Sequence, residues 1–175
     1  MKIMVIGYAS SGKSTFAKRL SELYDYPLLH VDKIAFLPNW VARERNLIEI
    51  DLREFMKNEN WVIDGLYRHI APERYDMTDQ IFIFDFNRFK CLYGAIYRRI
   101  KYHKKSRDSI ADGCKERLNL SFIWWILFSG RTRASKRLLK DISQNYKDKT
   151  IVFKNYKQVN GYLLENGYKG SLKYE

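Results

Sequence analysis

The stretch "GYASSGKST", residues 7–15, decides the fold because it satisfies the pattern G-x-x-x-x-G-K-[ST] in the context that this pattern requires. The apolar run "KIMVIG" precedes it, as a buried parallel strand would, and "KSTFAKRLSELY" follows with apolar residues at helical spacing. Glycine adopts backbone conformations that other residues resist, so consecutive N–H groups can surround phosphate oxygens at the start of the helix. The stretch predicts a nucleoside triphosphate site, and an ordinary glycine turn is the weaker alternative.

The residues of this loop have distinct expected tasks. Lys13 can reach between the β- and γ-phosphates, which makes it a catalytic candidate, and the Ser14 hydroxyl can ligate Mg²⁺. The residues expected to bind ATP are Gly7, Ser10, Ser11, Gly12, Lys13, Ser14 and Thr15.

A second residue that helps to bind Mg²⁺ is expected in "WVIDGLYR", residues 61–68, where Asp64 ends an apolar run. A carboxylate at a strand end beside the phosphate loop can hold a magnesium-bound water, since Mg²⁺ keeps much of its hydration. The alternative interpretation of Asp64 is a helix cap or a turn. Arg68 follows four residues later and is a substrate-binding candidate, placed to meet a second anionic group across the cleft.

The remaining periodicity predicts an α/β protein. Strand-like apolar runs separated by helical patterns occur at residues 2–7, 26–32, 61–64, 80–85 and 150–154. Strands that alternate with helices predict a five-stranded parallel sheet with helices on both faces, whose carboxyl edge binds ligands. With 175 residues, 46% of them hydrophobic, and no repeat or linker, we expect a single domain over residues 1–175.

Several other residues are expected to be structural. His30 lies in an apolar run and is expected to be a hydrogen-bonded core residue, and Asp85 is expected to cap the helix that follows it. The segment "SFIWWILF", residues 121–128, is expected to be core, with a partner surface as the alternative. The last few residues are expected to be a frayed end.

The net charge is +12, and residues 89–140 carry +11 of it through 14 Lys or Arg against three Asp or Glu. Such a field attracts nucleotide phosphates, nucleic acid or anionic membranes, and charge alone does not choose among them. The longest apolar run, residues 122–128, is far shorter than the ~20 residues that cross a bilayer. Cys91 and Cys114 lack the spacing of a zinc site or a disulfide framework, and no secretory signal is visible. We therefore expect a cytoplasmic protein without a membrane partner.

The acceptor side is expected in "HVDKIAFLPNW", residues 30–40. Asp32, at the end of the second apolar run, can orient an alcohol and take its proton, whereas a phosphate acceptor needs no base. Trp40 can stack on a ring of the acceptor. Both residues are substrate-binding candidates for a hydroxyl-bearing or nucleoside-like acceptor, and Asp32 is also a catalytic candidate. The alternative is a structural Asp and a core Trp.

Taken in order, "GYASSGKST", "HVDKIAFLPNW", "WVIDGLYR" and "SRDSIADGCKERLNLSFIWWILF" make nearly the whole chain resemble the bacterial topology modulation proteins, within the adenylate kinase-like group of P-loop kinases. The resemblance implies a P-loop NTPase fold of the nucleoside monophosphate kinase type, with ATP and Mg²⁺ as cofactors and an arginine-rich lid over about residues 98–135. The family name also implies an influence on DNA topology. The chain departs from true adenylate kinases because its second and third strands are too close for a long acceptor lid, which argues against AMP as the acceptor.

In such a lid, cationic groups surround the transferring phosphate and the closed lid excludes water. The segment offers more arginines than one triphosphate needs, so two or three are expected to contact phosphate. The others are expected to be solvated or paired with Glu116 and Asp112. We favour Arg98, Arg107 and Arg117 as the catalytic ones.

Two functions therefore follow from the sequence. The favoured one is an ATP- and Mg²⁺-dependent kinase acting on a small nucleoside-like, nucleotide-like or hydroxyl-bearing molecule. The alternative is an ATP-binding regulator of DNA topology that contacts nucleic acid through residues 89–140, where "IYRRIKYHKKSR" interleaves aromatic and basic residues. This segment lies where a kinase lid is expected and no recognisable DNA-binding module accompanies it, so at most weak nucleic-acid binding is expected.

Overall fold

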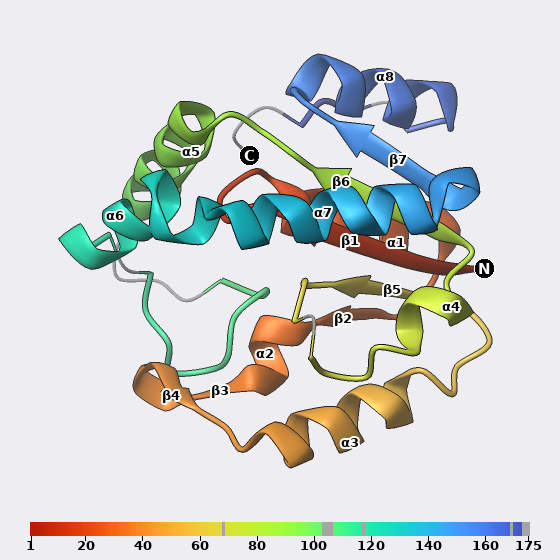
Figure 1. The fold of residues 1–175 in the computed structure, drawn as a ribbon, viewed down its shortest axis with the longest axis horizontal. Helices are drawn as coiled ribbons and strands as arrows, with labels where there is room; N and C mark the ends of the chain where they lie inside the picture. The colour runs from red at the N-terminus through yellow and green to blue at the C-terminus, as the bar shows by residue number, and fades with distance from the viewer. Residues whose placement is uncertain (68, 103–106, 117, 169, 173–175) are drawn as a thin grey trace.

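The structure is a computed structural model that describes residues 1–67, 69–102, 107–116, 118–168 and 170–172. At its centre is a five-stranded sheet in the order β2-β5-β1-β6-β7, in which all neighbouring strands are parallel (Figure 1). The strands are β1 (Lys2–Gly7), β2 (Leu28–His30), β5 (Trp61–Asp64), β6 (Gln80–Phe84) and β7 (Thr150–Phe153). The predicted five-stranded parallel sheet is thereby confirmed.

Helices connect these strands and cover the sheet. They are α1 (Lys13–Tyr24), α2 (Val31–Ala35), α3 (Arg45–Phe55), α4 (Arg74–Met77), α5 (Arg88–Lys101), α6 (Leu120–Leu127), α7 (Arg133–Asn145) and α8 (Tyr156–Glu165). Short 3₁₀ turns are η1 (Pro38–Trp40), η2 (Ser129–Arg131) and η3 (Lys147–Lys149). A separate antiparallel hairpin consists of β3 (Phe36–Leu37) and β4 (Val41–Ala42), with η1 between them.

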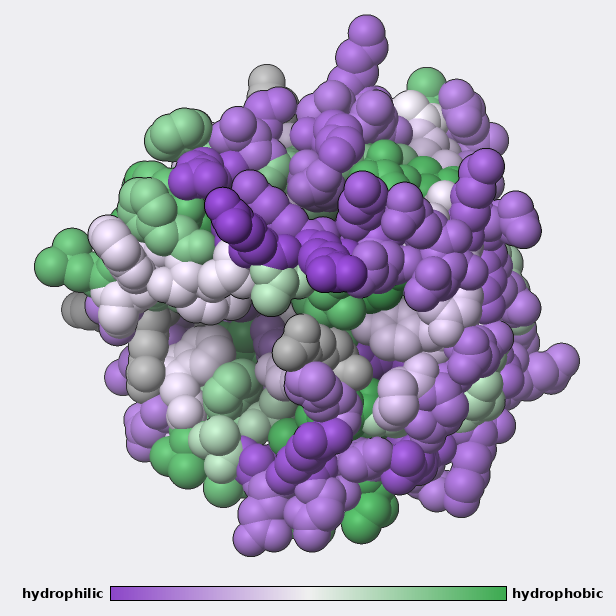
Figure 2. Space-filling model, viewed as in Figure 1, coloured by the Kyte–Doolittle hydropathy of each residue, from purple (hydrophilic) through white to green (hydrophobic). Residues whose placement is uncertain are grey.

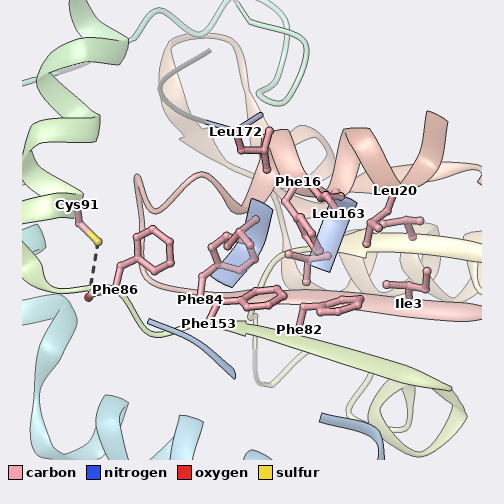
Figure 3. Packing of buried hydrophobic residues seen from close by; sticks show 14 of the residues in the cluster. Ile3, Phe16, Leu20, Phe82, Phe84, Phe86, Cys91, Phe153, Leu163 and Leu172 are labelled. Atoms are coloured by element: carbon pink, nitrogen blue, oxygen red, sulfur yellow. Dashed lines mark hydrogen bonds between the residues drawn. The ribbon is translucent and has the colours of Figure 1, made fainter. Parts of the chain in front are cut away.

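The strands send alternate side chains into two hydrophobic layers, as expected of a sheet covered on both faces. On one face, residues such as Ile3 and Phe82 share a buried cluster with side chains of α1, α5 and α8. On the other face, residues such as Met4 and Ile83 share one with side chains of α3 and α7. The first layer is aromatic: the ring centroid of Phe16 in α1 lies 5.0 Å from that of Phe82, edge to face (Figure 3).

The register of the sheet gathers the polar strand ends at one edge. Asp64 pairs with Val5 of β1 on one side and with His30 of β2 on the other. Gly7, at the end of β1, pairs with Phe84 of β6. Because all five strands run in the same direction, these carboxyl ends place His30 and Asp64 beside the loop that follows Gly7.

The expected frayed end stays a prediction, because residues 173–175 lie outside the described residues; Leu172 before them is only 2% exposed and packs into the aromatic layer. One local expectation was wrong. The cap of α5 is Asn87, whose side chain accepts a hydrogen bond from the Phe89 N–H at 2.8 Å. Asp85 forms an ion pair with Lys154 instead.

The segment 121–128 is also less buried than its apolar composition predicts. In α6, Ile126 is buried, but Trp124 is 60% exposed and Trp125 is 44% exposed, so the interpretation as core is wrong for most of the segment. Apolar side chains gather at the end of the molecule formed by α5 and α6, whereas hydrophilic side chains cover α7 (Figure 2). Within the described residues, no helix combines the length and the apolar character needed to span a membrane.

Candidate active site

The phosphate loop, residues 8–12, joins β1 to α1 and depends on the glycines at both of its ends. Gly7 has a φ of +137°, and a Cβ at this position would lie 2.4 Å from the carbonyl oxygen of Phe84 in the neighbouring strand. Gly12 has a φ of +88° and directly precedes α1. Any residue with a Cβ would be strained or excluded at both positions, so the tight turn into the helix requires glycine at 7 and at 12.

The predicted ATP-binding residues divide into two groups. A cavity of about 560 Å³ opens at the loop, and the residues of the loop and of the first helical turn that line it are Ala9, Ser10, Gly12, Lys13, Ser14 and Thr15. The side chain of Ser11 is buried instead, and its Oγ donates a hydrogen bond to the Tyr8 carbonyl at 2.7 Å. Ser11 and Gly7 therefore shape the loop rather than line the cavity.

Gly94 is a structural requirement of the loop that sequence reasoning missed. It lies within α5, and a Cβ there would approach the Ser10 carbonyl oxygen to 2.5 Å. The backbone of α5 therefore packs directly against the phosphate loop. A single glycine inside an otherwise helical pattern was the available signal, since such a residue often marks a close backbone approach.

Asp64 is the electrostatic centre of the loop's surroundings. Its buried carboxylate accepts a hydrogen bond from His30 Nδ1 through Oδ2 at 2.8 Å, and Lys13 Nζ lies 3.7 Å from Oδ1. Burial by itself would raise the pKa of Asp64, but the Lys13 ammonium, the His30 ring and the Ser14 hydroxyl outweigh it and lower this pKa to about 2. Asp64 is therefore ionised at neutral pH, and His30 is the hydrogen-bonded core residue predicted from the sequence.

The chemistry of Asp64 and Ser14 fits a Mg²⁺ ion. Oδ1 of Asp64 is buried and has no hydrogen-bond partner among the described residues, so an acceptor for a metal-bound water is left beside Lys13. One carboxylate and one hydroxyl suit Mg²⁺, which retains several waters and takes further ligands from substrate phosphates. The described part of the chain contains no cluster of three or more His, Cys, Asp or Glu that could hold a metal alone.

The same cavity extends from the loop to Asp32 and Trp40. Asp32 lies in the first turn of α2, just beyond β2, and its Oδ1 accepts a hydrogen bond from the Tyr67 hydroxyl at 2.8 Å. Burial, and then the charge of Asp32 and this hydrogen bond, raise the pKa of Tyr67, so the phenol stays protonated. The Trp40 ring meets the Phe36 ring edge to face, with centroids 5.3 Å apart. The cavity thus runs from the phosphate loop to Asp32, and these ends are called the donor end and the acceptor end after the roles predicted for them.

The acceptor end has a wall, here called the acceptor wall, that consists of the hairpin, residues 36–42, and residues 107–116. Trp40 Nε1 donates a hydrogen bond to the Lys115 carbonyl at 2.9 Å, and Cys114 Sγ donates one to a hairpin carbonyl at 3.3 Å. In Figure 1, residues 107–116 descend to β3 and β4. This contact was not predicted, because residues 107–116 were assigned to a lid over the donor phosphates.

Gly113 allows this contact. Its φ is +74°, and a Cβ there would lie 2.9 Å from Cβ of Pro38 in the hairpin. The glycine was visible in the sequence, but its neighbour across the wall could not be identified without the tertiary structure.

Arg98 and Arg107 both line the cavity, and Glu116 forms ion pairs with both. Arg98 Nε lies 2.5 Å from Oε1 of Glu116, and Arg107 Nε lies 2.9 Å from Oε2. Burial, followed by the charge of Arg107, lowers the pKa of Arg98 to about 10, while Glu116 acts in the opposite direction. Pairing with Glu116 was expected of other arginines, so the structure corrects the prediction on this point: the two favoured arginines are the ones that Glu116 holds.

Arg131, another arginine of the predicted lid, has different surroundings, and two of the candidate arginines are not described. Arg131 donates a hydrogen bond to Cys91 Sγ at 3.0 Å, and its guanidinium lies 3.7 Å from the centre of the Tyr8 ring. Arg68 and Arg117 lie outside the described residues, so their substrate-binding and catalytic roles stay predictions.

The comparisons with known proteins add a likeness of fold. No protein-family model and no curated protein matches the sequence. Among solved structures, the chain is similar to shikimate kinase from Aquifex aeolicus, with 18% identity, a TM-score of 0.45 and coverage of 97% of this chain and 100% of that one. It is also similar to shikimate kinase from Bacteroides thetaiotaomicron, with 16% identity, a TM-score of 0.49 and coverage of 94% and 95%.

Because both TM-scores are below 0.5, the fold assignment rests on this chain itself. Its central strand β1 leads into the phosphate loop and α1, and parallel strands flank it in the order β2-β5-β1-β6-β7. Helices cover both faces of the sheet. These features define a P-loop NTPase fold of the kinase type, as predicted.

Proposed function

We propose that this chain is an ATP- and Mg²⁺-dependent kinase that transfers the γ-phosphoryl group to a hydroxyl of a small molecule. The observation that carries the proposal is a single cavity of about 560 Å³ that is lined both by the phosphate loop and by Asp32. Phosphoryl transfer requires the donor phosphate and the acceptor oxygen to be held together, roughly in line and away from bulk water. A protein that only binds nucleotide needs no carboxylate opposite its phosphate loop.

At the donor end, Lys13 and the N-terminus of α1 would bind the phosphates of ATP. The Lys13 ammonium, 3.7 Å from Asp64 Oδ1, has a counter-ion without forming a short hydrogen bond to it, so it can turn to a phosphate at small cost. Mg²⁺ held through Ser14 and Asp64 would neutralise charge on the phosphates. Ionised Asp64 supports this arrangement, because its low pKa keeps the carboxylate charged across the physiological range.

At the acceptor end, Asp32 would orient the acceptor hydroxyl. Tyr67 donates to Oδ1 of Asp32, and among the described residues no other hydrogen bond to this carboxylate competes with the acceptor hydroxyl. As the hydroxyl oxygen bonds to the γ-phosphorus, the bond from that phosphorus to the bridging oxygen of ADP breaks, and the hydroxyl proton passes to Asp32. Trp40 would stack on a ring of the acceptor.

The finer expectations from the sequence belong to the same proposal. Residues 1–175 would form one domain of the topology modulation type, and residues 98–135 would move as a lid. Arg68 would contact substrate and Arg117 the transferring phosphate. The protein would act in the cytoplasm.

The alternative function, a nucleic-acid regulator acting through residues 89–140, is less well supported. Arg98 and Arg107 contribute to the charge of this segment, but both line the cavity and pair with Glu116. Side chains committed in this way are not part of a continuous external surface for a phosphate backbone.

The experiment that tests the kinase proposal is ADP release from Mg·ATP over a panel of nucleosides, polyols and hydroxy acids. Acceptor-dependent ADP release that disappears in Asp32→Asn, while fluorescent-nucleotide affinity persists, is the expected result. Nucleotide binding without any acceptor-dependent turnover, combined with duplex DNA affinity that falls steeply with salt and persists in saturating Mg·ATP, would favour the regulator.

A further inference from the structure

The cluster of Arg98, Arg107 and Glu116 is not explained by the donor chemistry above. Glu116 is almost completely buried, with 2% of its side chain exposed, and the two arginines are 18% and 14% exposed toward the cavity that they line. One carboxylate between two guanidinium groups leaves a net charge of +1. A buried charge of this kind is costly unless another group compensates it.

The hydrogen-bonding capacity of the cluster is also unbalanced. Two guanidinium groups carry ten N–H donors between them, whereas one carboxylate offers about four lone-pair positions. The closest approach of each arginine to Glu116 is through Nε, the atom farthest from the end of the guanidinium fork. Neither Nε has a hydrogen-bond partner among the described residues, and both side chains border the cavity, so the pair has donors left for a planar or tetrahedral anion.

The position of the cluster is at the acceptor end. Arg107 and Glu116 begin and end the segment that packs against the hairpin in the acceptor wall. Arg98 and Asp32 line the same cavity, and the negative charge of Asp32 raises the pKa of Arg98, although less than Glu116 does.

We infer that Arg98 and Arg107, held side by side by Glu116, bind an anionic group of the acceptor, so that the acceptor carries a carboxylate or phosphate in addition to its hydroxyl. This inference rests on the proposed function and specifies its substrate class. Glu116 is a positioning residue: its two carboxylate oxygens form ion pairs with the two guanidinium groups and hold them side by side. Asp32 then binds the hydroxyl of the acceptor and the arginine pair binds its anionic group. A neutral alcohol lacks the anionic group and would therefore bind less well.

The test uses inorganic phosphate and acetate as probes and first occupies the donor end. The protein is saturated with Mg·AMP-PNP, which is confirmed by nucleotide titration, and each anion is then titrated while tryptophan fluorescence is followed. We expect saturable binding of at least one anion, weakened about tenfold or more in Arg98→Ala and in Arg107→Ala. The control Lys136→Ala removes the same charge from α7, away from the cavity lining, and is expected to bind like the wild type. The preference between the two probes distinguishes a carboxylate from a phosphate on the acceptor.

A variant of the positioning residue separates orientation from simple electrostatics. Glu116→Gln adds one positive charge to the site, so a purely electrostatic site would bind the anion more tightly. A positioned pair would bind it more weakly, which is the result we expect, with recovery in Glu116→Asp. Circular dichroism and the unchanged AMP-PNP affinity establish that each variant is folded.

The outcomes against the inference are distinct from those against the proposed function. Absent or non-saturable anion binding to the nucleotide-loaded protein would overturn the inference, as would equal binding in the arginine variants and Lys136→Ala. Tighter anion binding by Glu116→Gln would overturn the positioning role. Failure to bind Mg·AMP-PNP at all would overturn the proposed function itself, and the acceptor assignment with it.

Discussion

The donor end and the acceptor end of the cavity are built in different ways. At the donor end, the phosphate loop and α1 follow β1 without interruption, and Asp64 joins them from the neighbouring strand. At the acceptor end, the wall depends on contacts such as the hydrogen bond between Trp40 and Lys115, which are 75 positions apart in the sequence. The first end is a product of local backbone geometry and sheet register, the second of long-range packing.

This difference implies that the two ends respond to mutation separately. The donor end is fixed by two glycines, by an adjacent strand and by the close approach of α5 at Gly94, and the ion pair that joins it to residues 107–116, Lys18 with Asp108, is exposed. The acceptor wall must bring two remote segments together against the entropy of the intervening chain. Variants at one end should therefore leave the ligand affinity of the other end intact, provided that the fold is kept.

The largest effect is expected for Lys13→Ala. Loss of a charge-assisted hydrogen bond to phosphate should weaken nucleotide affinity about 100-fold, equivalent to roughly 3 kcal/mol. Fluorescent-nucleotide titration measures this, with Lys57→Ala as the control because the Lys57 side chain, just beyond α3, is exposed and pairs with Glu54. Unchanged affinity in Lys13→Ala would mean that the loop does not bind nucleotide.

The next effect concerns the acid stability of the donor end. Folding lowers the pKa of Asp64 from 3.8 to about 2. Ionised Asp64 therefore contributes its full share to the free energy of unfolding above pH 3.8, and this share is lost as the pH falls through the folded-state pKa of about 2. Between about pH 5 and pH 2, the wild type should lose roughly 2 kcal/mol more unfolding free energy than Asp64→Asn. Urea unfolding at both pH values measures this, and an equal loss in the two proteins would contradict the assigned charge.

A smaller effect separates magnesium binding from nucleotide binding. Asp64→Asn should weaken nucleotide affinity in Mg²⁺ about tenfold more than it does in EDTA, because only the carboxylate can hold the metal-bound water. Titration of the same nucleotide under both conditions gives the ratio. Equal losses with and without the metal would assign Asp64 a structural role instead.

The smallest effect is expected at the acceptor wall. Trp40→Phe removes the hydrogen bond to the Lys115 carbonyl and should lower the free energy of unfolding by about 1 kcal/mol. Nucleotide affinity should not change, because the donor end does not use this contact. A loss of nucleotide affinity comparable to that of Lys13→Ala would show that the two ends are not independent.

Sequence reasoning succeeded where the physical determinants are local. Buried parallel strands must be continuously apolar, so the five strands were visible as short runs, and the glycines around the phosphate loop had to stand where φ is positive. It failed for α6, since an apolar composition does not reveal whether other elements cover a helix, and Trp124 remains largely exposed. It also failed for Asp85, because a carboxylate near a helix start can pair with a distant lysine instead.

The sequence by itself determined the sheet, the phosphate loop, and the gathering of Asp32 and Asp64 at one edge, because backbone conformation and strand direction follow from neighbouring residues. Only the tertiary structure decided that residues 107–116 complete the acceptor wall. It likewise decided that Glu116 forms ion pairs with both Arg98 and Arg107, and that α5 packs closely against the phosphate loop at Gly94. These contacts join segments that carry no information about each other in their local patterns. They form because burial and charge compensation are satisfied only after the chain has brought the segments together.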